Sequence, residues 1–168
     1  GLGDVYKRQI SINSSGTTVA IGAPGNNANG SNSGHVRVYE NIAGTWTQIG
    51  QDINGEAIND YSGRAISLSA DGTTVAIGAD GNDGVSLNTG HVRLYTKISD
   101  PILGTYTWTQ IGQDIDGESA DDQSGFSVSL SDDGNIVAVG AVKNNDNGSN
   151  SGHVRLFTKI SDPILGTY

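Results

Sequence analysis

The sequence predicts an all-β fold of the β-propeller type, built from four-stranded antiparallel blades with essentially no helix. Three observations support this. The hexapeptide GHVRVY that begins at Gly34 returns in similar form at Gly90 and Gly152, at offsets of 56 and 62 residues. A fixed period of this length indicates units that bury their apolar faces against neighbouring copies. Each unit contains short strand-like runs between turn residues, and no apolar period of 3.6 residues extends over three turns.

The first half of a repeat reads as a hairpin. In the complete copy, the alternation over 64–69 places Ile66 and Leu68 on one side of a strand. Asp71-Gly72 follows, and this dipeptide between two strand-like runs favours a tight turn, because Gly tolerates the positive φ. In the run over 73–79, the side chains on both faces are apolar or small. It therefore predicts a strand that is covered on both faces.

The second half of a repeat adds two more strands. A polar loop over 80–89 leads into a strand over 91–96, which Ser99-Asp100-Pro101 is expected to end because Pro fixes φ. A fourth strand spans 106–111, and a long loop over 112–125 leads into the next copy. Four short antiparallel strands per repeat favour a propeller blade. The alternative is a β-solenoid, whose coils are shorter and lack internal hairpins.

The repeats divide the chain into 10–62, 63–124 and a truncated 125–168, which amounts to about two complete blades and most of a third. Residues 1–9 do not fit the repeat. They resemble the translation of a sequencing adapter and are predicted to be a non-native scar, the alternative being a divergent first strand. Residues 158–168 duplicate 96–106 and the sequence then stops. We therefore expect a fragment of a longer protein that stacks its blades openly and cannot close a ring alone.

Composition excludes several classes of function. The 168 residues carry a formal net charge of −9 and no cysteine. Absence of cysteine excludes a disulfide scaffold and cysteine-ligated metals. An acidic surface repels phosphate, so nucleic acid is not an expected partner. No apolar run is long enough to predict membrane insertion.

Two motifs together resemble a known family. IGAP at 21–24, followed by GHVRVY at 34–39, is similar to the FG-GAP repeat of integrin α-subunit propellers, and more so to a variant common in secreted, multi-repeat microbial proteins. Gly125-Phe126 stands in the place of the FG half, and the resemblance covers 10–168. It implies a propeller of about seven blades, completed by further blades of the same full-length chain. It also implies an extracellular or cell-surface location and a role in binding protein or glycan ligands, or in adhesion.

The resemblance also implies Ca²⁺ in an Asp-rich loop between the first two strands of a blade. The corresponding segments, 13–16, 69–72 and 131–134, have only four residues. They cannot supply the six to eight oxygens that Ca²⁺ takes, so they predict tight turns and no metal.

A second acidic cluster recurs in the long loops between repeats. Its members are Asp114, Asp116, Glu118, Asp121 and Asp122, with Asp52, Asn54, Glu56, Asn59 and Asp60 as counterparts. Clustered carboxylates could hold a hard cation, but the spacing does not match an EF-hand. The favoured interpretation is Asx-turn chemistry in a solvated loop, with no cofactor.

Three residue types recur in register: His35, His91 and His153; Arg37, Arg93 and Arg155; Trp46 and Trp108. A catalytic histidine is normally singular and has a dedicated base partner, so these histidines are interpreted as framework. The arginines are expected to pair with acidic loops between blades, and the tryptophans to pack blade against blade. The alternatives are a histidine ring that binds metal and an aromatic ladder that binds carbohydrate. No catalytic, cofactor-binding or metal-binding residue is predicted.

The predicted function is therefore non-catalytic. The chain is expected to be a propeller segment of a larger extracellular protein that binds ligand or mediates adhesion through loops that differ between copies, at 26–33, 81–89 and 143–151. One alternative is a spacer with no specific ligand. Another is part of a propeller hydrolase or lyase whose catalytic residues lie outside this segment.

Overall fold

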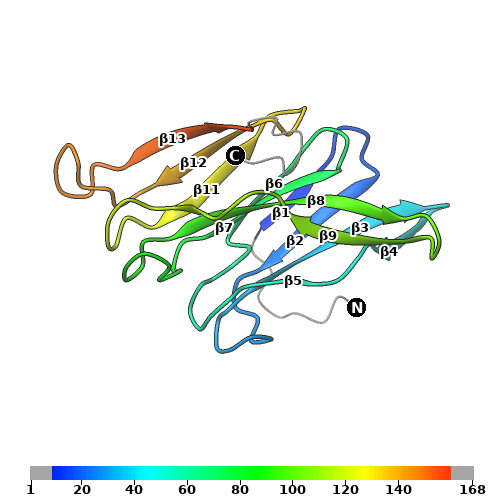
Figure 1. The fold of residues 1–168 in the computed structure, drawn as a ribbon, viewed down its shortest axis with the longest axis horizontal. Helices are drawn as coiled ribbons and strands as arrows, with labels where there is room; N and C mark the ends of the chain where they lie inside the picture. Colours follow the sequence, from blue (N-terminus) through cyan, green and yellow to red (C-terminus); the bar gives the residue numbers. More distant parts are fainter. Residues whose placement is uncertain (1–8, 160–168) are drawn as a thin grey trace.

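The computed structural model describes residues 9–159, which form thirteen strands in three antiparallel sheets and contain no helix. The predicted all-β class is confirmed. Figure 1 shows the sheets side by side, in the order of the sequence. No described residue belongs to a helix that could cross a membrane.

Each sheet corresponds to one repeat and is called a blade. Blade 1 has the order β1-β2-β3-β4, with the short β5 also paired to β3: β1 (Gln9–Ile12), β2 (Thr18–Ala23), β3 (His35–Ile42), β4 (Thr45–Gln48) and β5 (Ile53–Asn54). Blade 2 repeats this plan: β6 (Ala65–Leu68), β7 (Thr74–Ala79), β8 (His91–Asp100), β9 (Thr105–Gln110) and β10 (Ile115–Asp116). Blade 3 contains β11 (Ser124–Leu130), β12 (Ile136–Ala141) and β13 (His153–Thr158).

Two strand predictions need correction. The third strand of blade 2 does not end before Ser99, because β8 continues to Asp100 and pairs Ser99 with Tyr106. Pro101 falls in the turn, where the Asp100 carboxylate accepts hydrogen bonds from the next two backbone N–H groups. The connection at 112–125 is also not a plain loop. It contains β10, in which Ile115 pairs with Val92 on the free edge of β8.

Some sequence predictions fall outside the described residues. These are residues 1–8 of the segment interpreted as a scar, and 160–168 of the duplicated tail. Gln9, grouped with that segment, is the first residue of β1 and pairs with Gly22.

The cores lie between blades, at interfaces that we call seams. Seam 1 joins the two apolar faces of blades 1 and 2: Ala20, Val36, Val38 and Ile53 against Ile66, Leu68, Val75, Ile77, Tyr95 and Trp108. Seam 2 joins blades 2 and 3: Ala76, Val92, Leu94 and Ile115 against Val128, Leu130, Val137, Val139 and Phe157. All six residues of β7 are buried, as the apolar run predicts for a strand covered on both faces.

A serine hydroxyl repeats across both seams. Ser11 Oγ accepts the backbone N–H of Leu68 at 3.0 Å, and Ser67 Oγ accepts that of Leu130 at 3.0 Å. These two bonds occupy equivalent positions, because in each case the serine lies on the first strand of a blade and accepts a hydrogen bond from the next blade. They set the register of neighbouring blades along the strand direction.

Candidate functional site

One end of the blades is built from two classes of loop that hold each other. The first class joins the second strand of a blade to the third, at 24–34, 80–90 and 142–152, and these loops follow the lower left edge of Figure 1 in blue, green and orange. The second class comprises the long connections between blades. In blade 1, backbone N–H groups of Asn59, Tyr61 and Ser62 donate to the carbonyls of Ser31, Asn32 and Ser33. Because the blade 2 loops repeat the same three bonds, this loop end is preorganised.

Buried aspartates fix the second class of loop. Asp60 Oδ2 accepts the backbone N–H groups of Glu56 and Ala57 at 2.9 and 2.8 Å. Asp122 Oδ2 accepts Ser119 N–H at 3.0 Å and also the Asn144 amide of blade 3 at 3.1 Å. The predicted Asx-turn chemistry is confirmed. The prediction of a solvated loop is wrong for these two carboxylates, which are buried because the first class of loop folds over them.

The loops of the first class share a framework, and the blade 2 loop carries two large apolar residues that the other two loops lack. Loop 26–33 reads NNANGSNS and loop 144–151 reads NNDNGSNS, whereas loop 82–89 reads NDGVSLNT. Val85 therefore stands where the other loops have Asn, and Leu87 where they have Ser. Both side chains project into solvent, with 65% and 61% of their surface exposed. Exposed apolar residues on a preorganised polar loop are typical of a contact surface.

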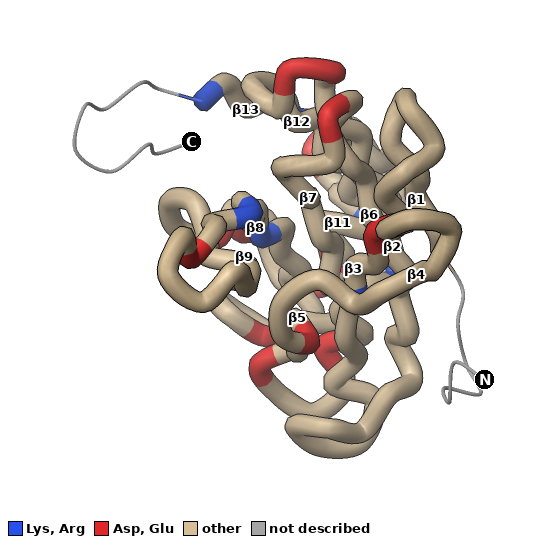
Figure 2. The backbone as a smooth tube through the Cα atoms, turned by 90° about the vertical axis from the view of Figure 1, so that its right-hand side faces the viewer, with Lys and Arg blue, Asp and Glu red and all other residues tan. Residues whose placement is uncertain are grey.

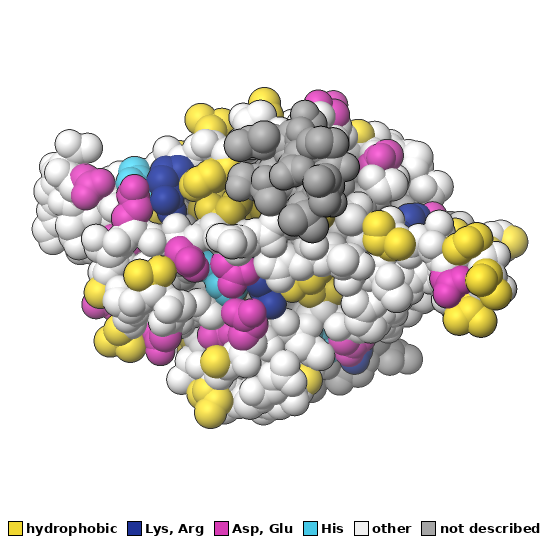
Figure 3. Space-filling model, viewed as in Figure 1, with side chains coloured by type: hydrophobic (Ala, Val, Ile, Leu, Met, Phe, Trp, Pro, Cys, Tyr) yellow, Lys and Arg dark blue, Asp and Glu magenta, His cyan; other side chains and the backbone are white. Residues whose placement is uncertain are grey.

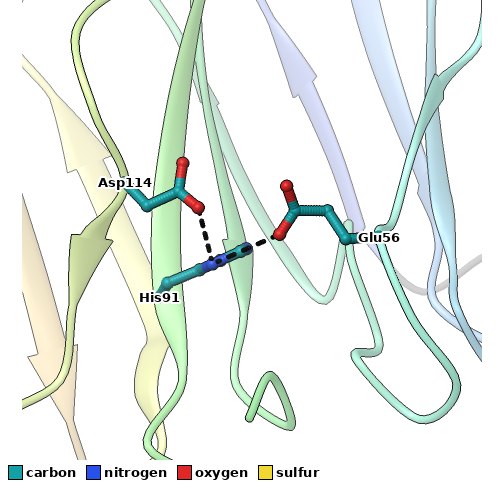
Figure 4. A group of neighbouring side chains, drawn as sticks. All are labelled: Glu56, His91 and Asp114. Atoms are coloured by element: carbon teal, nitrogen blue, oxygen red, sulfur yellow. Dashed lines mark ion pairs between the residues drawn. The ribbon is translucent and has the colours of Figure 1, made fainter. Parts of the chain in front are cut away.

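A charged cluster lies across seam 1, just below these loops. Arg93 donates to the Asn54 carbonyl at 2.8 Å and pairs with Glu56 at 3.3 Å, so blade 2 reaches into blade 1. The buried His91 Nδ1 lies 3.4 Å from Asp114 Oδ2 and 4.0 Å from Glu56 Oε2 (Figure 4). In Figure 3 the cyan histidine patches lie beside magenta and blue side chains.

Seam 2 repeats this arrangement. Arg155 donates to the Asp116 carbonyl and pairs with Glu118 at 3.7 Å, while His153 Nε2 lies 3.5 Å from Glu118. In blade 1 the equivalent Arg37 donates from Nε and one terminal nitrogen to the two oxygens of Asp52, at 3.0 and 2.8 Å. The predicted pairing of arginines with acidic loops is confirmed, and at both seams it joins neighbouring blades.

The carboxylates of this region differ in pKa. Hydrogen bonds from Arg37 hold the pKa of Asp52 below its usual range, and the His91 side chain lowers the pKa of Asp114. Burial raises the pKa of Asp80 even though Arg64 Nε lies 2.9 Å from its carboxylate. Burial also raises the pKa of Asp116. Figure 2 shows several of the acidic positions in red beside β5.

Glu56, His91 and Asp114 are also the residues that could hold a metal, since their ligand atoms lie within 4.8 Å of one another. Two features favour an ion-pair cluster over a metal centre. Arg93 already neutralises Glu56, and within the described residues His91 Nε2 has no hydrogen-bond partner to orient a metal-bound ring. The group at seam 2 consists of Glu118, Asp146 and His153. Its Asp146 lies in the loop between β12 and β13, whereas Asp114 at seam 1 lies in the connection between β9 and β10. The expectation of no metal ligand stays a prediction.

The short hairpin segments lie at the opposite end of the blades. Gly72 N–H donates to the Ser69 carbonyl at 3.0 Å, and Asp71 Oδ1 accepts the Ser69 hydroxyl and the Thr73 N–H at 2.6 and 2.9 Å. Segments 13–16 and 131–134 close with the same backbone bond. The predicted tight turns are confirmed, and the Asp71 carboxylate is committed to its own turn.

The two tryptophans have different surroundings. Trp108 is 3% exposed in seam 1, whereas Trp46, its counterpart in blade 1, is 46% exposed. The predicted packing of blade against blade is confirmed for Trp108.

The Asp52–Arg37 pair makes stability depend on pH. The folded-state pKa of Asp52 is depressed, so its contribution is present above the unfolded value of about 3.9 and is lost as pH falls through the lower folded pKa. We expect Asp52→Asn to be less stable than wild type at pH 7, and the difference to shrink towards pH 2. Urea unfolding at both pH values measures this. Arg37→Met is the matched control and should show the same loss of pH dependence; an Asp52→Asn deficit of equal size at both pH values would contradict the assignment.

Comparison with known proteins identifies the repeat. Residues 115–157, which include the third GHVR motif and the seam 2 acids, match the FG-GAP repeat family. No curated protein matches the chain in sequence.

Solved structures share the fold. A "putative 6-phosphogluconolactonase" from Bacteroides fragilis matches with a TM-score of 0.59 at 18% identity, over 96% of this chain and 37% of that one. The tricorn protease matches with a TM-score of 0.51 at 9% identity, over 94% of this chain and 14% of that one. The chain thus spans less than two fifths of either protein, and at such identities the likeness shows the fold alone.

Proposed function

We propose that the chain is a non-catalytic binding module whose ligand contacts the loop end of blade 2, because residues 115–157 match the FG-GAP repeat family and the three sheets form a propeller segment. The observation that carries the proposal is the pair of exposed apolar residues, Val85 and Leu87, on a loop that is polar in both sister copies. Repeating positions build the seams, so the positions that differ are available for recognition.

The chemistry of this surface favours a protein ligand over a glycan. Leu87 contributes its backbone carbonyl to the Asp121 N–H at 2.9 Å, which holds the loop while leaving the side chain free to contact a partner. Binding would therefore cost little conformational entropy in this chain, because the loop is already ordered. The carboxylates of Asp83 and Asp121 belong to the same loop end, because both accept hydrogen bonds from Asn88, the residue after Leu87. A surface that combines exposed apolar side chains with carboxylates suits a peptide that carries both apolar and basic residues. The proposal includes an extracellular or cell-surface location, which the family resemblance supports.

A selection from a phage-displayed peptide library tests the proposal. Val85→Asn with Leu87→Ser installs the residues of the sister loops, so the fold should be kept. We expect the selected peptides to be enriched in apolar and basic residues, and their affinity to fall by about tenfold or more in this double variant. Isothermal titration of each selected peptide against wild type and variant gives the ratio.

The matched control uses exposed apolar residues at the other end of the blade. Ile102→Ser with Leu103→Ser changes the β8–β9 turn, where both side chains are exposed. Peptide affinity should be unchanged in this variant. Peptides that bind the loop variant as tightly as wild type, or that lose affinity only in the control, would overturn the proposal.

A further inference from the structure

A groove of about 420 Å³ lies between the outer strands of blades 1 and 2, and we call it the seam 1 groove. Blade 1 lines it with Ile42 and residues 47–50, and blade 2 lines it with residues 104–106. Its volume falls within the range of ligand pockets in proteins, about 300–1,000 Å³. Both walls belong to described strands of neighbouring blades, so the groove is complete within the described residues.

The blade 2 wall comes from a hairpin that is longer in this repeat than in the first. His35 and His91 are 56 residues apart, whereas Trp46 and Trp108 are 62 residues apart, so the β8–β9 hairpin contains six additional residues. β8 and β9 have ten and six residues, where β3 and β4 have eight and four. Residues 104–106 fall within this added length, which therefore builds one side of the groove.

β9 is an edge strand that turns hydrogen-bonding groups away from β8. Gln51 of blade 1 binds two of them, because its Nε2 donates to the Trp108 carbonyl at 2.8 Å and its Oε1 accepts the Trp108 N–H at 3.2 Å. Backbone groups alternate between the two sides of a strand, so Tyr106 presents its N–H and carbonyl on this same edge. The carbonyl lies against Gly50, where an added Cβ would be 3.1 Å from the oxygen. Among the described residues β9 pairs with no strand other than β8, so the Tyr106 N–H is open towards the groove.

This edge lacks the features that keep an edge strand from pairing. The sequence TYTWTQ over 105–110 has no charged residue and no proline, which are common protections of an edge. The charges beside the groove are already engaged. Lys97, which lies over the Tyr106 ring, pairs with Glu40 at 3.5 Å, and Asp100 accepts two backbone N–H groups of its own turn. The groove therefore combines apolar surface with an open backbone N–H.

We propose that the seam 1 groove binds an extended, uncharged peptide segment of a partner protein, which pairs with the edge of β9. The groups to be satisfied belong to a strand edge, and the Gln51 amide, with the donor and acceptor of a peptide group, already pairs with the adjacent position. The segment would place an apolar side chain against Ile42, which is half-exposed, above the buried Ile49. In strand addition, main-chain hydrogen bonds supply affinity and side-chain pockets supply specificity.

Peptide selection in a chain without the proposed loop-end site tests this. Linear peptides displayed on phage are selected on the Val85→Asn, Leu87→Ser variant, and we expect enrichment of uncharged peptides with apolar residues at alternating positions. In that background, Tyr106→Pro removes the edge N–H, and proline is tolerated where an edge N–H points outward. Tyr106→Ala is the matched control, because it also lacks the ring but keeps the N–H. The selected peptides should bind the proline variant about tenfold or more weakly than the alanine variant in isothermal titration.

Amide hydrogen exchange followed by NMR gives a second measurement that does not depend on the proline variant. Bound peptide should slow exchange of the Tyr106 N–H by about tenfold or more, and leave unchanged that of Trp46, an edge amide of β4 that does not line the groove. Circular dichroism verifies that both Tyr106 variants are folded, and the exchange measurement decides alone if the proline variant is not.

Three results would each overturn the proposal: no enriched peptide, equal affinity for folded proline and alanine variants, or a Tyr106 amide that the peptide does not protect. Peptides that depend on Val85 and Leu87 should bind Tyr106→Pro as tightly as wild type. Failure of the groove proposal is therefore distinguishable from failure of the proposed loop-end binding.

Discussion

Trp108→Ala is expected to lower the free energy of unfolding by about 3–5 kcal/mol. The indole fills seam 1 and is almost fully buried, so truncation leaves a cavity between two blades. Its Nε1–H donates to the Ile49 carbonyl at 2.9 Å, and that acceptor would be left without its donor. The Gln51 side chain binds both the N–H and the carbonyl of residue 108, which places the ring against blade 1. Urea unfolding followed by circular dichroism measures the loss.

Trp46→Ala is the matched control, because it changes the same position of the preceding repeat. Trp46 is 46% exposed, so its loss should change the free energy of unfolding by less than about 1 kcal/mol. Both variants are compared at a concentration where the chain is monomeric. Equal losses at the two positions would show that burial in seam 1 is not the cause.

Gly78→Ala is expected to cost about 3 kcal/mol or more, because the added methyl group has no space. A Cβ at position 78 would lie 2.0 Å from the carbonyl oxygen of Gly125, so the backbones of blades 2 and 3 cross in direct contact. A backbone carbonyl cannot rotate away as a side chain can, and the two blades would have to separate. Seam 1 has the same crossing, between Gly22 and the carbonyl of Gly63.

The control for this prediction is Gly140→Ala, at the equivalent position of blade 3. Its Cβ would meet the Ser127 hydroxyl at 2.3 Å, and that group can move by rotating about its Cα–Cβ bond. Neither Gly78 nor Gly140 has a left-handed φ, so backbone strain does not separate the two variants. We expect Gly140→Ala to cost less than about 1 kcal/mol. A comparable loss in both variants, measured by urea unfolding, would contradict the crossing as the cause.

The blade plan could be predicted from the sequence because it rests on local signals. Alternation around Ile66 and the Asp71-Gly72 turn each act within a few residues, and repetition confirms them. Recurrence in register also predicted that Trp108 packs between blades and that the arginines pair across them, since a residue kept in every copy serves contacts that every copy makes.

Other features depend on contacts between distant residues, and the sequence carried no signal for them. β10 is too short to show a period and forms because β8 offers a free edge. The burial of Asp60 and Asp122 arises when a second loop folds over them, which a composition rich in acidic residues does not reveal. Val85 and Leu87 could have been found by aligning the three loops residue by residue, because only their loop departs from the shared polar pattern.

The serine hydrogen bonds and the glutamate–arginine pairs make the two seams interchangeable. Blade 2 contacts blade 3 through Ser67 and Glu118, and blade 1 contacts blade 2 through the equivalent Ser11 and Glu56. Each repeat therefore carries one half of the contact to the preceding blade and one half of the contact to the following blade. Recombination that duplicates or deletes one whole repeat therefore leaves every remaining blade with a matching neighbour, whereas a break inside a repeat does not. The identical segments 96–106 and 158–168 are what recent duplication of such a unit leaves in a gene. The genetic unit that can change in number is thus the same as the physical unit that packs.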